Sequence, residues 1–191
     1  MSEFAWGDQL PTIAGTRVVL RALRSSDVPD LFAIFSDPDV VRYWDGALMT
    51  SAADASEYLQ QIEANFRDRQ LFQWGIANQA TASILGTCTL LHVNTTHQRG
   101  EIGFALGKPH WRKGLARDAV ATLISFAFER MDLHRLEADV DPRNTRSLRL
   151  LERLGFQREG CLRERYHLNG ELQDAVLLGL LRPEWKVPQG R

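Results

Sequence analysis

The chain has 191 residues, of which 44% are hydrophobic and 25% are charged, and its formal net charge is −1. These values are typical of one globular domain with a sizeable core, and the balanced charge does not favour a nucleic-acid partner. No apolar run approaches the ~20 residues of a membrane-spanning helix. The N-terminus lacks the basic and apolar parts of a secretory signal, so we expect a cytoplasmic protein without a membrane partner.

Periodicity and turn residues predict the elements in chain order. A strand is expected over 16–23, a helix over 26–35, an aromatic loop over 42–46 and a helix from residue 50 or 51 to 67. The second half predicts strands over 72–78, 84–93 and 100–106, a helix over 115–131, a strand over 135–140, a helix over 144–154 and a hairpin of 156–167 with 172–181. This order predicts a single domain over residues 1–191, with its core at about 14–183 and helices packed on one mixed α/β or α+β sheet.

The helix that begins at Leu115 starts with a charge pattern that opposes its dipole. Arg112, Lys113 and Arg117 crowd an end where free N–H groups already disfavour cations. No Ser, Thr, Asp or Asn immediately before the first turn caps it. A bound anion would explain both features, because Gly114 lets the backbone approach it. A poorly capped helix with solvated basic residues would show the same pattern, so both interpretations remain open here.

The preceding strand has two unlike faces. One face is apolar and the other combines small residues with a carboxylate. The apolar face consists of Ile102, Phe104 and Leu106, and the other of Glu101, Gly103 and Ala105. The second face leaves room for a ligand beside the strand, although an ordinary half-exposed strand with a surface Glu would look similar.

Asn144 and Ser147 stand at the start of the helix predicted over 144–154. Their spacing favours Asn144 as the N-cap and Ser147 as the third helical residue. The two Cys and five His of the chain lack the spacing of metal ligands, so we expect no metal site.

Together these segments resemble the GNAT superfamily of acetyl-CoA-dependent N-acetyltransferases, and most of all its RimJ/RimL branch, which acetylates the N-termini of ribosomal proteins. The resemblance covers nearly the whole chain, and the order and spacing of its motifs make it specific. The motifs are Thr16–Leu23, Ser36–Trp44, Glu101–Leu106, Trp111–Ala119, Asn144–Phe156, Glu159–Arg163 and Asn169–Asp174. The resemblance implies a mixed, mostly antiparallel central sheet flanked by helices.

The resemblance also implies acetyl-CoA as the acetyl donor. Backbone N–H groups from Arg112 to Ala116 would hold the pyrophosphate, and the backbone of Phe104–Leu106 would pair with the pantetheine amides. Asn144 and Ser147 would contact the pantetheine and the sulfur end. The implied cofactor-binding residues are Phe104, Ala105, Leu106, Trp111, Arg112, Lys113, Gly114, Leu115, Ala116, Arg117, Asn144 and Ser147. Trp111 stands where many members of the family have Gln or Arg.

We expect Glu101 to remove the proton of the acceptor amine, through water, before the amine attacks the thioester directly. Ser147 would donate a hydrogen bond to the departing thiolate. An α-amine has a pKa of about 8 and a lysine amine one of about 10. An α-amine therefore needs less help from a base to become neutral.

The resemblance favours a protein or peptide N-terminal α-amine as the acceptor. The implied substrate-binding residues are Tyr43, Trp44 and Asp45 near the entrance, with Arg163 and Tyr166 opposite. Tyr166 lies near the position where some relatives have an acidic residue. The alternative acceptors are an amino acid, a polyamine or an aminoglycoside-like drug. A further alternative is a CoA-binding sensor without turnover. Monomer and homodimer both remain open.

Overall fold

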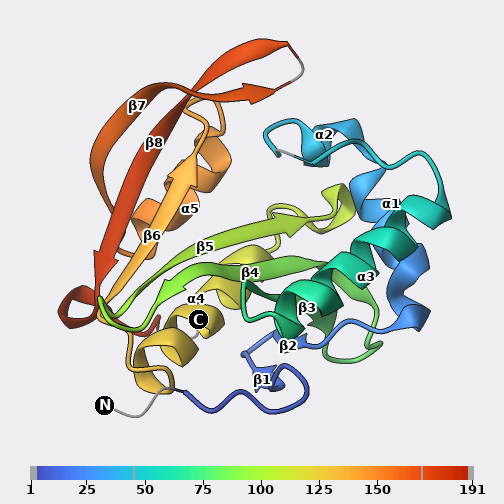
Figure 1. The fold of residues 1–191 in the computed structure, drawn as a ribbon, viewed down its shortest axis with the longest axis horizontal. Coiled ribbons are helices and arrows are strands. Elements are labelled where there is room, and N and C mark those ends of the chain that lie inside the picture. The colour runs from blue at the N-terminus through green and yellow to red at the C-terminus, as the bar shows by residue number, and fades with distance from the viewer. Residues whose placement is uncertain (1–3, 45, 169, 189–191) are drawn as a thin grey trace.

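The computed structural model describes residues 4–44, 46–168 and 170–188, and one eight-stranded sheet runs through it (Figure 1). The strand order is β1-β2-β3-β4-β5-β6-β8-β7. Every neighbouring pair is antiparallel except β5 and β6, which are parallel. The mixed, mostly antiparallel sheet that the motifs implied is therefore confirmed.

The bounds of the elements follow the predicted order closely. The strands are β1 (Ile13–Ala14), β2 (Val18–Arg21), β3 (Leu71–Asn78), β4 (Ile84–Asn94), β5 (Arg99–Leu106), β6 (Arg135–Val140), β7 (Gln157–Leu168) and β8 (Glu171–Leu181). The α-helices are α1 (Val28–Phe35), α2 (Pro38–Val41), α3 (Ala52–Arg67), α4 (Leu115–Glu129) and α5 (Thr145–Arg153). Short 3₁₀ turns occupy Ser25–Asp27, Lys108–His110 and Arg182–Glu184.

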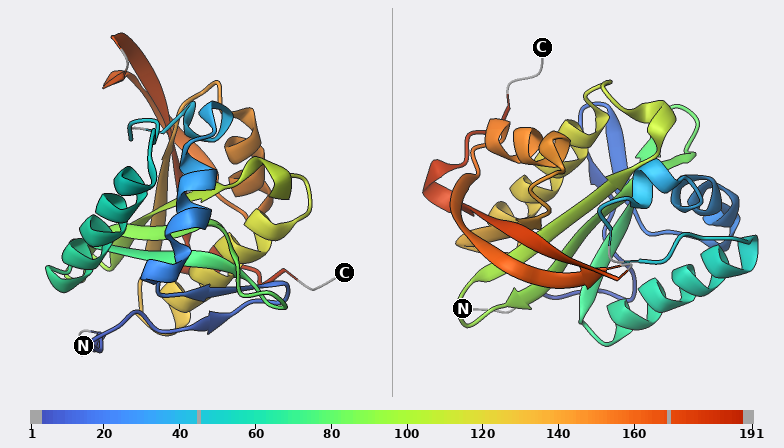
Figure 2. Two further views of the ribbon diagram at one scale, coloured as in Figure 1. Left: turned by 90° about the vertical axis from the view of Figure 1, so that its right-hand side faces the viewer. Right: turned by 90° about the horizontal axis from the view of Figure 1, so that it is seen from above.

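Helices cover the two faces of the sheet unequally (Figures 1 and 2). The larger core lies between the sheet and the helices α4 and α5, and it includes Trp74, Leu123, Leu136 and Leu151. The helices α1 and α3 cover the opposite face at the strands β2 to β5, where a second apolar cluster lies. These two helices leave the β6, β8 and β7 side of that face uncovered (Figure 2). No helix within the described ranges is long and apolar enough to cross a membrane.

The parallel pair β5–β6 determines the shape of the middle of the sheet. Its register runs over only three positions, from Arg99 opposite Arg135 to Glu101 opposite Glu137. On its other side β5 stays paired with β4 as far as Leu106. The two parallel strands therefore separate after Glu101, and Figure 1 shows them diverging from a common base.

The strand predicted over 16–23 is shorter than expected, because β2 begins only at Val18 and residues 15–17 form a turn. The carboxylate of Asp118, in the first turn of α4, accepts hydrogen bonds from the backbone N–H groups of Thr16, Arg17 and Val18 at 3.2, 2.7 and 3.0 Å. A residue about one hundred positions away thus holds this turn, which local alternation could not reveal.

We expect Asp118→Ala to lower the free energy of unfolding by about 2 kcal/mol, because a carboxylate that accepts several backbone hydrogen bonds is lost. Urea denaturation measures this change. The control Glu63→Ala replaces an exposed side chain on α3 and should stay within about 0.5 kcal/mol of the original chain. Equal stability of the two variants would show that the Asp118 clamp contributes little.

Candidate active site

The N-terminus of α4 carries free amides and an excess of positive charge. Gly114 is its N-cap with a left-handed φ of +77°, and the cap makes no side-chain hydrogen bond to the amides of the first turn. The side chains of Arg112, Lys113 and Arg117 are exposed around it. Sequence reasoning missed a fourth cation, Arg17, whose guanidinium donates to the carbonyl of Lys113. Since the acidic side chain of this turn is engaged by the β1–β2 turn, the helix end favours an anion.

The β5 edge that faces the opening has no strand partner beyond Glu101 within the described residues. Gly103 leaves space on the face that carries Glu101, since a Cβ there would meet only Thr89 at 3.9 Å. The side chain of Ala105 instead packs among the helices α1 and α3. The predicted small-residue face is thus open at one position only, and Ala105 can offer a ligand only its backbone.

Trp111 connects the end of β5 with α5. Its indole Nε1 donates to the carbonyl oxygen of Leu106 at 2.6 Å, and the Arg146 guanidinium lies 4.6 Å from its ring centroid. In α5, the Asn144 side chain accepts a hydrogen bond from the Ser147 amide at 3.2 Å. The N-cap interpretation of Asn144 is therefore confirmed. Asn144 and Ser147 follow β6 in the chain, at the start of α5.

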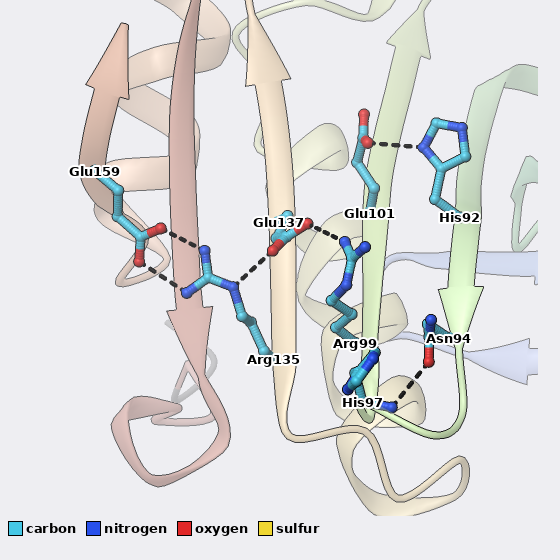
Figure 3. A network of polar contacts seen from close by, with 8 residues as sticks. All are labelled: His92, Asn94, His97, Arg99, Glu101, Arg135, Glu137 and Glu159. Carbon is cyan, nitrogen blue, oxygen red and sulfur yellow. Dashed lines mark hydrogen bonds and ion pairs between the residues drawn. The ribbon is translucent and has the colours of Figure 1, made fainter.

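Glu101 lines a cavity of about 330 Å³ on the sheet face of α1 and α3, toward the side that these helices leave uncovered. Its side chain is 24% exposed, and its Oε2 lies 3.0 Å from Nδ1 of His92 (Figure 3). His92 has a left-handed φ of +50° at an irregularity in the β4–β5 register. Bulges often redirect a side chain near a functional site, and here one brings an imidazole to the candidate base.

Below Glu101, an ion-pair ladder links side chains of β5, β6 and β7 (Figure 3). Arg99 donates to Glu137 at 2.9 Å, and Arg135 donates to Glu137 at 2.8 Å and to Glu159. The ladder passes over Gly179 of β8, where a Cβ would overlap the Glu159 carboxylate. The hydrogen bond from Arg135 holds the pKa of the Glu159 carboxyl below its ordinary value. Both carboxylates of the ladder are therefore already paired with guanidinium groups.

Tyr166, near the position where some relatives have an acidic residue, is hydrogen-bonded to an acidic residue of another strand. Its hydroxyl donates to Oδ2 of Asp139, on β6, at 2.8 Å. Burial, followed by this hydrogen bond and the charge of Asp139, raises the pKa of Tyr166 to about 12. The negative charge of Glu101 acts on this pKa in the same direction.

The other predicted acceptor residues are dispersed. Trp44 packs against Phe35 with a centroid distance of 5.5 Å, so its ring belongs to the second apolar cluster. Tyr43 lies between the guanidinium groups of Arg42 and Arg143, at 5.4 and 5.8 Å. Asp45 lies outside the described residues. Arg163 is exposed on β7, in a separate shallow hollow.

Sequence reasoning missed two residues that the fold brings beside the candidate base, His92 and Asp139. Asp139 falls within the strand predicted over 135–140, but the pattern gave no sign of the Tyr166 hydroxyl that donates to it. Nothing in the chain around His92 indicated the bulge. Among the described residues, no group of three or more His, Cys, Asp or Glu side chains could hold a metal ion.

Residues 17–157 match the model of the acetyltransferase (GNAT) domain family. The chain is 35% identical over 176 residues to a Bacillus licheniformis protein named uncharacterized N-acetyltransferase p20, covering 92% of this chain and 99% of that protein. It is 30% identical over 128 residues to the ribosomal protein uS5–alanine N-acetyltransferase of Escherichia coli, covering 66% of each. The crystal structure of Vibrio cholerae spermidine N-acetyltransferase with CoA and spermine matches with a TM-score of 0.76 and 23% identity, over 88% of this chain and 98% of that chain.

The chain therefore belongs to the GNAT family of acetyltransferases, and it is an N-acetyltransferase that uses acetyl-CoA. The match to an enzyme that acts on a ribosomal protein agrees with the RimJ/RimL-like motifs. The geometry fits this donor, because a cationic helix end suits a pyrophosphate and an unpaired strand edge suits the pantetheine amides.

We expect Gly114→Ala to raise the KM for acetyl-CoA by about 10-fold, because a non-glycine residue at this φ costs about 1–2 kcal/mol and reshapes the helix end. The KM for the amine should change little. Gly170→Ala is the matched control, since Gly170 also has a positive φ, +80°, but stands at the tip of the β7–β8 hairpin. Steady-state kinetics check both variants, and an unchanged KM for acetyl-CoA in Gly114→Ala would contradict the pyrophosphate assignment.

Proposed function

We propose that the acceptor is the α-amine of a protein or peptide N-terminus. The charge pattern of the Glu101 cavity carries this proposal. Three guanidinium groups line the cavity, those of Arg99, Arg135 and Arg165. A polyamine would bring several ammonium groups against these cations, and the ladder carboxylates that could receive them are already paired. An N-terminal peptide brings a single ammonium group, and the E. coli relative named for a ribosomal-protein alanine supports the same class.

The donor would lie along the opening between β5 and β6. Amides from Arg112 to Ala116, with the charges of Arg112, Lys113 and Arg117, would hold the pyrophosphate. The backbone of Phe104–Leu106 would pair with the pantetheine. Trp111 would keep the end of β5 and the start of α5 in place, and Asn144 would act through its cap on α5.

Acetyl-CoA supplies an activated acetyl group as a thioester. In our proposal Glu101 accepts a proton from the acceptor amine, through water, and the neutral amine then attacks directly in a ternary complex. His92 fixes the orientation of the Glu101 carboxylate. A backbone N–H group of β5 would stabilise the oxyanion, and the Ser147 hydroxyl would donate a hydrogen bond to the departing thiolate.

An acceptor panel tests the proposed substrate class. We expect thiol release from acetyl-CoA with alanine-initiated peptides and much slower release with spermidine, free amino acids and an aminoglycoside. Mass spectrometry should find one acetyl group at the peptide α-amine. Faster release with spermidine would make the small-amine alternative correct. No release with any amine, despite binding of CoA, would indicate a sensor.

We expect Glu101→Gln to lower kcat/KM at pH 7 by about 10²–10³-fold, which is typical of a lost general base. The deficit should shrink above pH 9, because an α-amine with a pKa of about 8 is then already neutral. The pH profile of peptide acetylation measures both effects. Glu63→Gln, on the outer side of α3, is the control and should follow the original profile. A deficit that is the same at all pH values would exclude Glu101 as the base.

A further inference from the structure

Asp139 is a buried carboxylate with an unused oxygen at the wall of the Glu101 cavity. It lies on β6, two residues beyond the last position that pairs with β5, and on the same strand face as Glu137. Its side chain is only 7% exposed. Oδ2 accepts the Tyr166 hydroxyl, whereas Oδ1 is buried and has no hydrogen-bond partner within the described part of the chain.

Buried polar atoms usually have a hydrogen-bond partner, and Oδ1 of Asp139 has none among the described residues, so a bound ligand could supply the missing donor. A buried acceptor without a donor costs free energy, and the cost is larger when the group is charged. The nearest cation is Arg165, whose Nε lies 3.6 Å from Oδ2, beyond hydrogen-bond length. The other two guanidinium groups of the cavity are bonded to the ladder carboxylates. Glu101 and Asp139 are therefore the carboxylates of this cavity without a guanidinium at hydrogen-bond distance.

Residues of three other strands surround Asp139. Tyr166 and Arg165 face it from β7, Leu177 stands opposite it on β8, and Glu101 lines the same cavity from β5. The phenol remains protonated across the physiological range, since the pKa of Tyr166 is about 12, so it keeps donating to Oδ2. Oδ1 is then the carboxylate oxygen left for a further donor, and because it is buried, a donor from the cavity reaches it when the surrounding side chains shift.

We propose that Asp139 binds the acceptor amine in its ammonium form, opposite the base. The inference rests on the proposed function and deepens it, because it defines the ligand of this subsite as a single primary ammonium group. One N–H of the ammonium donates to Oδ1 of Asp139. Another proton passes to Glu101, through water, and leaves the lone pair of the neutral amine free to attack. Asp139 thus recognises the charged acceptor, and Glu101 makes it reactive.

The experiment compares two ligands on the enzyme saturated with CoA at pH 6.5. One is an alanine-initiated tripeptide, and the other is its lactyl analogue, in which a hydroxyl replaces the α-amine. We expect calorimetry to show the amine bound about 10-fold or more tightly than the hydroxyl, as an ion-paired hydrogen bond predicts. Asp139→Asn should abolish this preference and leave the affinity for the lactyl peptide unchanged. The preference should also fade by pH 9.5, where the free amine is neutral.

The variant Tyr166→Phe tests whether Asp139 binds the amine itself or only holds Tyr166 in place. This variant keeps the Asp139 carboxylate, so the preference for the amine should persist. If both variants lose the preference equally, Asp139 serves only to hold Tyr166, and the inference is wrong. A preserved preference in Asp139→Asn, or none in the original enzyme, also overturns it. Asp132→Asn, which removes an exposed charge paired with Arg182 outside the cavity, is the control for charge loss and folding.

The proposed acceptor and the role of Asp139 can fail separately. If turnover identifies spermidine instead of peptides, the proposed acceptor is wrong, and the same affinity comparison is made with spermidine. A loss of about 10-fold or more in Asp139→Asn then still supports an ammonium subsite. Unchanged spermidine affinity in that variant would overturn it.

Discussion

The rest of the site depends on the separation of the strands β5 and β6. Two parallel strands pair over three positions and then separate, while β5 keeps its antiparallel partner on the other side. Backbone N–H and C=O groups at the freed edge need partners, and a ligand with its own amides can supply them. The Trp111 ring, just before α4, lies 4.6 Å from the guanidinium of Arg146 in the first turn of α5, so the starts of these two helices lie close together.

The charges of the cavity follow from the same geometry. Where β5 and β6 are still paired, their outward side chains form a ladder of guanidinium and carboxylate groups that neutralise one another. Gly179 makes the ladder possible, because no side chain on β8 blocks the bridge to Glu159. At the last paired position and beyond it, Glu101 and Asp139 have no guanidinium at hydrogen-bond distance. The cavity therefore combines a neutralised ion-pair ladder with two carboxylates outside it.

Local patterns predicted most of the elements because each is determined by short-range chemistry. The strand over 135–140 has the predicted bounds, and α3 has Ser51, one of its two predicted starts, as its N-cap. The cations before Leu115 correctly indicated a helix end without a side-chain cap. Prediction failed at residues 16 and 17, where the Asp118 clamp holds a turn in place of a strand. The ring of Trp44 packs on Phe35, and its expected place near the substrate entrance stays a prediction.

The sequence by itself determined the family, the donor and the order of the elements, since motifs and periodicity are local and their spacing along the chain is specific. It also identified Glu101 as a candidate base. Only the tertiary structure decided what surrounds that carboxylate. The imidazole of His92 reaches Glu101 through a strand irregularity, and Tyr166 of β7 reaches Asp139 of β6 across an intervening strand. Such contacts depend on register and on the parting of two strands, which no local pattern encodes.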